Sequence, residues 1–269
     1  MEYKTKWLND GVKITLNGKS IIISNIIGGE ASNPYTNEQL KGIIKIFFSE
    51  FDEIYKGDIY HQDGNVANPK LYKFISSETY KKYISKGKFQ LGSLQYYREI
   101  ENLKIKDRKE GLSHVILENK GHILNASVIS GFDKYLFCAS TGLDDMSFKK
   151  GNFGDYVMEI ANVRSFSEAV SKSIGAKKWT VKKVFYSDYK AYKMIFQEDI
   201  GLDLNILFKP ELVEKLITVS EMPSVFGKPY SFKPEEEIRI AFDLGKDVKK
   251  KCLQFHNPGL LDYIDIRKI

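Results

Sequence analysis

Short apolar segments rich in β-branched and aromatic residues recur along the whole chain, with no regular alternation between strands and helices. The first two, VKITL and SIIISNI, flank Asn17-Gly18, a dipeptide typical of a tight hairpin turn. Later segments of the same kind are LYKFIS, KFQLGSLQYY, HVILEN, HILNASVI, KYLFCAST, DYVMEI, WTVKKVFYS and EEEIRIAFDL. Because parallel strands need long crossover connections, this pattern predicts an α+β fold with mixed or antiparallel sheets and disfavours a Rossmann-type domain.

Helical spacing is confined to a few stretches. After Asn33-Pro34, Thr36 can cap a helix whose apolar residues recur from Leu40 to Phe51. The turn-rich segment GDIYHQDGNVANPK, residues 57–70, then predicts a linker. We therefore expect a hairpin-plus-helix extension over residues 1–60 and a main domain over residues 68–269.

Within that main domain, further helices are expected. Gly87 follows ETYKKYIS at a position suited to a helix end, and residues 164–175 have helical patterning. The stretch 189–219 also has helical patterning, and Pro210 is placed to start the second of its helices.

Composition limits the cell compartment and the partners. The 41 basic and 35 acidic residues give a net charge of +6, which favours anionic partners, although a lysine-coated surface explains the same balance. Cys138 and Cys252 are too few for a disulfide framework and lack metal-ligand spacing, so we expect a reducing cytoplasm and no metal site. No apolar run approaches the roughly 20 residues of a transmembrane helix, which predicts no membrane association.

The first two of three segments carry candidate polar side chains at strand ends. One runs from LYKFIS, which contains Lys73, to a second predicted strand that ends in Tyr96, Tyr97 and Arg98. Adjacent residues of a strand face opposite sides, so either Tyr96 or Tyr97 should line a cleft. The other segment is YLFCASTG, whose predicted strand ends at Ser140-Thr141.

The third segment, PEEEIRIAF, places three glutamates immediately before an apolar strand. Strand alternation would put Glu235 and Glu237 on one face and Glu236 on the other. Two carboxylates on one face suit acid, base or cation-stabilising chemistry, whereas a solvated acidic turn is the simpler explanation.

In their order along the chain, these segments resemble the ADP-ribosyltransferase superfamily. The matching elements are Tyr72-Lys73, Ser140-Thr141 and the glutamate triplet with Ile238, although Lys73 stands where that superfamily has Arg or His. The opening of the main domain is similar to that of the DarT toxins. The combination of LYKFIS, YYREIE, FCAST and EEEIRI resembles a group of bacterial abortive-infection proteins.

The resemblance implies a transferase that cleaves the nicotinamide N-glycosidic bond of NAD and passes ADP-ribose to a nucleic-acid or protein acceptor. It implies that Glu237 stabilises the oxocarbenium-like transition state and that Glu235 orients or deprotonates the acceptor. The other implied roles are contacts with the ribose or diphosphate of NAD, stacking on nicotinamide, and support of Glu237. The residues implied in these roles are Lys73, Tyr96, Tyr97, Arg98, Ser140 and Thr141.

Two functions are therefore expected from the sequence. The first is an ADP-ribosyltransferase that acts as a toxin or phage-defence effector, with a neutralising antitoxin as a possible partner. The alternative is a catalytically silent module of the same fold that binds nucleic acid or protein through its tyrosines and lysines.

Overall fold

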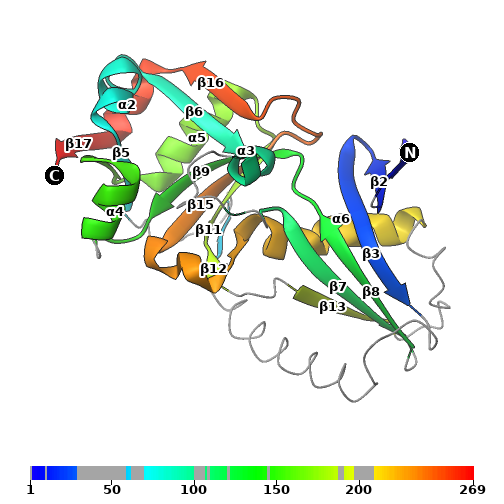
Figure 1. Ribbon diagram of the computed structural model, residues 1–269. Helices are drawn as coiled ribbons and strands as arrows, with labels where there is room; N and C mark the ends of the chain where they lie inside the picture. Colours follow the sequence, from blue (N-terminus) through cyan, green and yellow to red (C-terminus); the bar gives the residue numbers. More distant parts are fainter. Residues whose placement is uncertain are drawn as a thin grey trace. The chain divides into compact units, whose positions relative to one another are not determined.

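The computed structural model describes residues 2–9, 11–28, 59–61, 70–99, 107, 110–119, 122–143, 146–186, 191–196 and 209–269 of the 269-residue chain. It has a mixed α and β fold whose sheets are mostly antiparallel, with one sheet curled into a half-barrel (Figure 1). The α+β class expected from the sequence is thereby confirmed. The predicted helix over residues 36–51 lies outside the described residues, as do residues 57–58 and 62–69 of the predicted linker, whereas its residues 59–61 form a strand.

The chain divides into two compact units, each built from separate stretches of sequence. Unit 1 contains residues 1–57, 109–132 and 187–229, and unit 2 contains residues 58–108, 133–186 and 230–269. These units do not follow the expected division into 1–60 and 68–269.

Unit 1 contains a six-stranded sheet in the order β1-β2-β3-β8-β7-β13, in which only the β13–β7 pair is parallel. Its elements are β1 (Tyr3–Leu8), β2 (Gly11–Leu16), β3 (Lys19–Gly28), β7 (Leu112–Asn119), β8 (His122–Ile129), β13 (Ala191–Phe196), α6 (Pro210–Phe226) and β14 (Gly227–Lys228). The β2–β3 turn is the predicted one, with φ of 51° at Asn17 and 83° at Gly18, the left-handed conformations that an Asn-Gly hairpin turn requires.

One face of this sheet forms the core of unit 1. Alternate residues of β2 and β3, including Val12, Ile14, Ile21 and Ile23, are fully buried and pack with apolar residues of β7, β8 and α6. A two-stranded hairpin cannot bury such a face alone, so β8 and α6 supply its cover and are part of the same compact unit. This packing explains why the hairpin is not a separate N-terminal extension.

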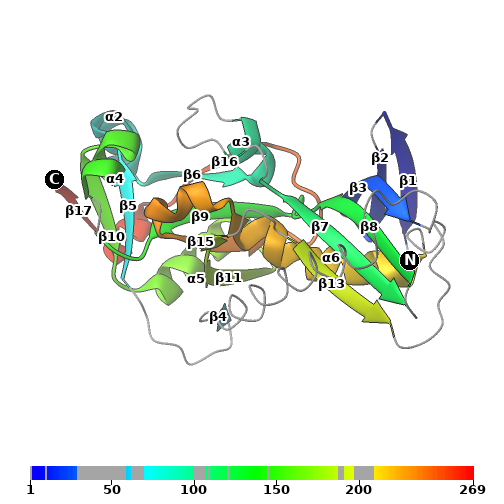
Figure 2. The same ribbon diagram turned by 60° about the horizontal axis from the view of Figure 1, so that its bottom comes forward.

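Unit 2 contains the second large sheet, in the order β17-β10-β5-β9-β15-β11-β4, with β6 pairing both β9 and β16 (Figure 2). Its strands are β4 (Ile59–His61), β5 (Leu71–Ile75), β6 (Lys88–Ser93), β9 (Lys134–Ser140), β10 (Tyr156–Ile160), β11 (Lys178–Lys183), β12 (Phe185–Tyr186), β15 (Glu237–Asp243), β16 (Cys252–His256) and β17 (Ile264–Lys268). Its helices are α2 (Ser77–Lys82), α3 (Leu94–Glu99), α4 (Met146–Phe153) and α5 (Val163–Ile174), with 3-10 helices η1 (Ile84–Lys86), η3 (Tyr230–Glu235) and η4 (Pro258–Tyr263).

The core of unit 2 lies between one face of this sheet and α5. Phe137 of β9, Ile238 and Ile240 of β15, and Phe166 of α5 are all buried in one cluster. Helix α5 begins where Asn162 accepts a hydrogen bond from the Ser165 amide, and it ends at Gly175 with φ of 69°. These boundaries lie within one residue of the 164–175 expected from the sequence.

Two predicted elements differ from the observed ones. The LQYYRE segment forms α3 rather than the end of a strand, because the Ser93 hydroxyl accepts a hydrogen bond from the Tyr96 amide and caps a helix. The stretch 189–219 was expected to be helical, but β13 occupies part of it and α6 begins only at Pro210. Proline at the first helical position was predicted correctly.

Candidate functional site

The end of strand β9 belongs to one of the three candidate segments and contacts the other two. Ser140 is the cross-strand partner of Glu237 on β15 and of Tyr72 on β5. Residues directly opposite each other in an antiparallel pair project to the same face of a sheet. Tyr72, Ser140 and Glu237, which are far apart in the sequence, therefore lie side by side on one face of unit 2.

The Glu237 carboxylate is buried and held by an arginine on its own strand. Arg239 Nε donates to Glu237 Oε1 at 2.7 Å, and Arg239 Nη2 lies 3.5 Å from Oε2. The two residues are 6% and 1% exposed, so the pair is enclosed. A buried carboxylate requires such a counter-charge, and the two-residue spacing along β15 puts both side chains on one face.

A thiol and a phenol extend this charged pair. Cys138, the cross-strand partner of Arg239, has a pKa raised to about 12, mainly by burial and also by the negative charge of Glu237. Burial likewise raises the pKa of Tyr97 well above its usual value, and the Tyr97 hydroxyl donates to the Leu136 carbonyl at 3.5 Å. Both groups are therefore neutral near pH 7. We call Tyr97, Cys138, Glu237 and Arg239 the β9–β15 cluster.

The turn before β15 is also fixed to the end of β9. The Ser140 hydroxyl donates to the Glu235 carbonyl at 2.8 Å, and the Thr141 amide donates to the Glu236 carbonyl at 3.2 Å. Glu236 has φ of +46°, a conformation rare for a residue with a Cβ, and strained residues of this kind concentrate at functional sites. The Glu237 amide donates to the Tyr186 hydroxyl at 2.7 Å.

Glu235 and Glu237 do not lie on one face of a strand, contrary to what the sequence predicted. Glu235 ends the 3-10 helix η3, so strand alternation does not extend to it, although its side chain is 7% exposed. Ser140 supports Glu235 through the backbone, and no hydrogen bond from Ser140 to the Glu237 carboxylate is observed among the described residues.

Lys73 lies on the opposite face from Glu237. Its cross-strand partner Met158 is in the apolar core, and the Lys73 ammonium lies 4.8 Å from the centre of the Phe137 ring and donates to the Cys138 carbonyl at 2.7 Å. Burial lowers the pKa of Lys73, while Cys138 and Glu237 act in the opposite direction. The ammonium is thus engaged inside unit 2, which does not suit the expected contact with a diphosphate.

Helix α3 changes how the two tyrosines are presented. Tyr96 and Tyr97 do not alternate across a strand; their rings contact each other at 5.3 Å between centres. A Cβ on Gly92 would lie 2.6 Å from Tyr96 and 2.9 Å from Tyr97, so glycine is needed for the rings to approach β6. Tyr97 joins the β9–β15 cluster, and Arg98 is half-buried on the same helix.

Sequence reasoning missed three members of this region: Cys138, Tyr186 and Arg239. The signal for Arg239 was present, because it stands two residues after Glu237 in an apolar strand, where a charged residue needs a partner. Cys138 also stands two residues before Ser140 and therefore shares its strand face, whereas Tyr186 could not be found from spacing because the turn geometry brings it in.

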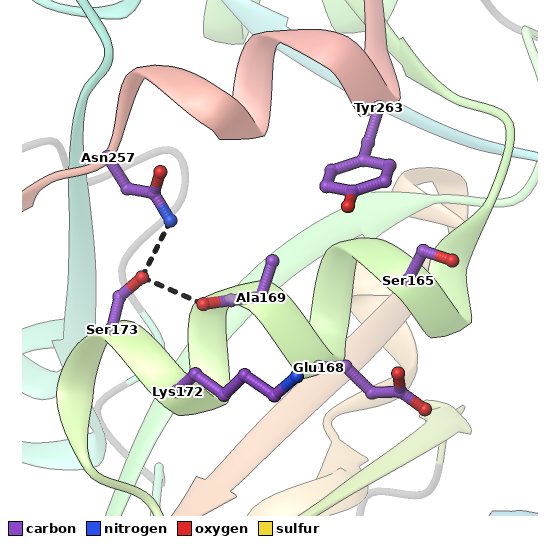
Figure 3. A pocket seen from close by; sticks show the side chains of 7 residues that line it. All are labelled: Ser165, Glu168, Ala169, Lys172, Ser173, Asn257 and Tyr263. Carbon is purple, nitrogen blue, oxygen red and sulfur yellow. Dashed lines mark hydrogen bonds between the residues drawn. The ribbon is translucent and has the colours of Figure 1, made fainter.

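A separate hollow of about 490 Å³ lies between α5 and η4 and contains none of these residues (Figure 3). Asn257 donates to Ser173 at 2.8 Å, and Ser173 donates to the Ala169 carbonyl at 2.7 Å, so two of its polar groups satisfy each other. Its other lining side chains are Ser165, Glu168, Lys172 and Tyr263.

The chain matches no family model, and comparisons with curated proteins and with solved structures give no significant match. Among the residues that the structure describes, no group of three or more His, Cys, Asp or Glu side chains is placed to hold a metal ion. Within the same part of the chain, no helix is long and apolar enough to cross a membrane.

Proposed function

We propose that the chain is an NAD-dependent ADP-ribosyltransferase of the ADP-ribosyltransferase-like fold, with Glu237 as its central carboxylate. The observation that carries this proposal is the cross-strand placement of Ser140 between Tyr72 and Glu237. The three segments that resemble the superfamily in sequence order contribute neighbouring strands. Tyr72 of the first segment and Ser140 of the second lie on the face that carries Glu237 of the third. The strained backbone at Glu236 supports a functional role for this turn.

The proposed reaction transfers ADP-ribose from NAD to an acceptor. The bond between the ribose C1′ and the nicotinamide nitrogen breaks, its electron pair leaves with nicotinamide, and an acceptor oxygen or nitrogen forms the new bond to C1′. The acceptor proton passes to a base, for which Glu235 is the candidate. Glu237 offsets the positive charge that develops on the ribose, the interaction that such a transition state needs most.

In this proposal, Arg239 positions Glu237, and Tyr97 together with Cys138 encloses it. Tyr96 and Arg98 on α3 remain candidates for contacts with NAD, whereas the enclosed ammonium of Lys73 is assigned a structural role. The acceptor is nucleic acid or protein, and the resemblance to abortive-infection proteins supports a toxin or phage-defence effector in the cytoplasm, with an antitoxin as partner.

A catalytically silent module is the second candidate, because one observation favours it. The Glu237 carboxylate is only 6% exposed and is engaged by Arg239, an arrangement that a purely structural ion pair would also have. In that case the unit would keep its fold without turning over NAD.

Label transfer from NAD distinguishes the two. Wild type, Glu237→Gln and Glu236→Gln are incubated with adenine-labelled NAD and bacterial RNA, DNA or protein extract in separate tubes. The enzyme proposal predicts label in one tube with wild type and Glu236→Gln, and a loss of at least about 100-fold with Glu237→Gln. Equal labelling by all three variants, or none by any, would reject the assignment of Glu237.

A further inference from the structure

We propose that the chain forms a homodimer in which strand β17 of unit 2 pairs antiparallel with β17 of a second copy, with Ile266 on the twofold axis. β17 is the last strand in the order of its sheet, and among the described residues it pairs with β10 alone (Figure 1). The surface that makes the contact is therefore one edge of a single sheet. This inference concerns unit 2 alone and does not depend on NAD chemistry.

Alternate residues of β17 direct their backbone groups toward this open edge. The Ile269 amide donates to the Asp155 carbonyl at 2.9 Å, so these two residues are a hydrogen-bonded pair of the β10–β17 ladder. Hydrogen-bonded and non-hydrogen-bonded pairs alternate along an antiparallel ladder, so Arg267 and Asp265 also bond to β10 through their backbones. The backbone groups of the residues between them therefore point away from β10.

These outward backbone groups match those of a second copy. Ile264 uses its amide within its own chain, for a hydrogen bond to the Leu261 carbonyl, and offers its carbonyl at the edge. With the axis at Ile266, each Ile266 amide meets the Ile266 carbonyl of the other copy, and each Lys268 amide meets the Ile264 carbonyl. The edge is thus complementary to itself, as a contact across a twofold axis requires.

The same alignment brings opposite charges together. Arg267 comes two residues after Asp265, so both side chains lie on one face of β17, and both are exposed. With Ile266 on the axis, Asp265 of each copy lies directly opposite Arg267 of the other. Opposite charges at directly opposed positions stabilise an antiparallel pair of strands.

Within one copy, β10 does not supply these opposite charges. The cross-strand neighbour of Asp265 is Glu159, and that of Arg267 is Val157. Like charges opposite each other are unfavourable, and Lys70, which pairs with Glu159 at 2.7 Å, offsets part of this repulsion. Arg267 of a second copy would give Asp265 a cation on its other side.

Other alignments of the two strands lose this complementarity. An axis at Asp265 would oppose two aspartates, and an axis at Arg267 would oppose two arginines. Moving the axis to Ile264 or Lys268 separates the acidic residue from the arginine. Charged residues on an edge strand usually prevent pairing with other strands, so their complementarity in one alignment selects a second copy as the partner.

The opposite face of β17 is apolar. Ile264 and Ile266 are half-buried and pack against the core of unit 2. In the dimer the two Ile266 side chains contact each other and continue this core across the axis, which buries apolar surface. Because the contact is confined to one short strand from each copy, we expect a dissociation constant on the order of 10 μM.

The test measures the molecular mass of the full chain in solution. Sedimentation equilibrium is recorded from about 1 to 200 μM protein for wild type, Asp265→Arg and Arg267→Asp. Wild type should change from the 30.9 kDa monomer toward twice that mass over this range. Each single variant opposes like charges on both sides of the axis, so its dissociation constant should rise at least about tenfold.

Mixing the two variants tests the alignment itself. In a mixed dimer both positions are basic in one copy and acidic in the other, so every cross-strand pair attracts again. The equimolar mixture should therefore dimerise within about threefold of the wild-type dissociation constant, and so should the double variant D265R/R267D.

A matched control separates this contact from a general effect of charge. Lys81→Asp makes the same change in net charge as Arg267→Asp, at an exposed lysine of α2, and should change the dissociation constant less than about twofold.

Three results would overturn the proposal. They are a wild type that stays monomeric up to about 200 μM, single variants that dimerise as wild type does, and an equimolar mixture that is no more dimeric than its components. Far-ultraviolet circular dichroism identifies any variant that fails to fold. For such a variant, Asp265→Asn or Arg267→Gln takes its place, with an expected rise of about threefold.

Discussion

Strands β1 and β2 of unit 1 and strand β15 of unit 2 place their charged residues in opposite ways. In unit 1 the lysines of β1 and β2 lie on the sheet face away from α6, here named the outer face of unit 1, and the covered face is apolar. In unit 2, charged residues are buried at both ends of β15. Arg239 pairs with Glu237 at one end, and Lys134 pairs with Asp133 and Asp243 at the other. All five of these unit 2 residues are buried.

This difference separates surfaces that attract a ligand from sites that orient chemical groups. Exposed lysines change the free energy of folding little, and together they favour the binding of an anion over a broad area. Buried ion pairs lose their hydration, so they add little net stability, but each partner becomes indispensable once the other is present. The comparison predicts large effects of substitution in the β9–β15 cluster and small effects on the outer face of unit 1.

The largest effect is expected for Arg239→Ala. It leaves the Glu237 carboxylate buried without its guanidinium, which should lower the free energy of unfolding by about 3–5 kcal/mol. Urea unfolding is followed by the emission of Trp179, which lies in unit 2, in a Trp7→Phe background. The double variant R239M/E237L should recover most of the loss, and a cost under about 1 kcal/mol for Arg239→Ala would show that the pair is not enclosed.

A smaller loss is expected for Gly92→Ala. The new methyl group would meet the Tyr96 and Tyr97 rings at under 3 Å, and such overpacking costs about 1–3 kcal/mol. Gly151→Ala in α4 is the matched control: nothing lies within 4 Å of its Cβ position, so it should stabilise the protein by about 0.5–1 kcal/mol. Differential scanning calorimetry of both variants checks the sign of each change, and similar melting temperatures would contradict the close approach of α3 to β6.

The next effect concerns pH. The Cys138 pKa of about 12 in the folded protein exceeds the ordinary value of 9.0, so above pH 9 the unfolded chain binds fewer protons than the native one and stability falls as pH rises. From pH 9 to pH 10, wild type should lose about 1 kcal/mol more than Cys138→Ser, whose hydroxyl does not titrate. Equal slopes in urea titrations at the two pH values would mean that the thiol is solvated.

The smallest effect is expected for Lys6→Gln. Lys6 is exposed, and a substitution on the surface usually changes stability by less than about 0.5 kcal/mol, so the urea midpoint should stay unchanged. A clear decrease, measured by Trp7 emission, would contradict the view that the outer face of unit 1 is not needed for folding.

Local signals in the sequence were sufficient for many elements. The Asn17-Gly18 turn, the end of η1 at Gly87, the limits of α5 and the start of α6 at Pro210 follow from residues within one turn of the feature. The division into units was not local, because β3 pairs with β8, which lies about 100 residues later in the chain.

The candidate site was predicted in part for the same reason. The pattern identified Glu237, Ser140 and Tyr97, but the orientation of Lys73 depends on its pairing with β10, and the place of Glu235 depends on η3. Tyr96 and Tyr97 have good strand propensity, which the Ser93 cap overrides.

Nicotinamide release from NAD tests the central claim most directly, since it needs no knowledge of the acceptor. Purified wild type, Glu237→Gln and Glu236→Gln, each shown to be folded by near-ultraviolet circular dichroism, are compared by chromatography of the products. The account predicts nicotinamide from wild type and Glu236→Gln, with a loss of at least about 100-fold for Glu237→Gln. Release by folded Glu237→Gln at the wild-type rate would contradict it and leave Glu237 and Arg239 as a structural pair.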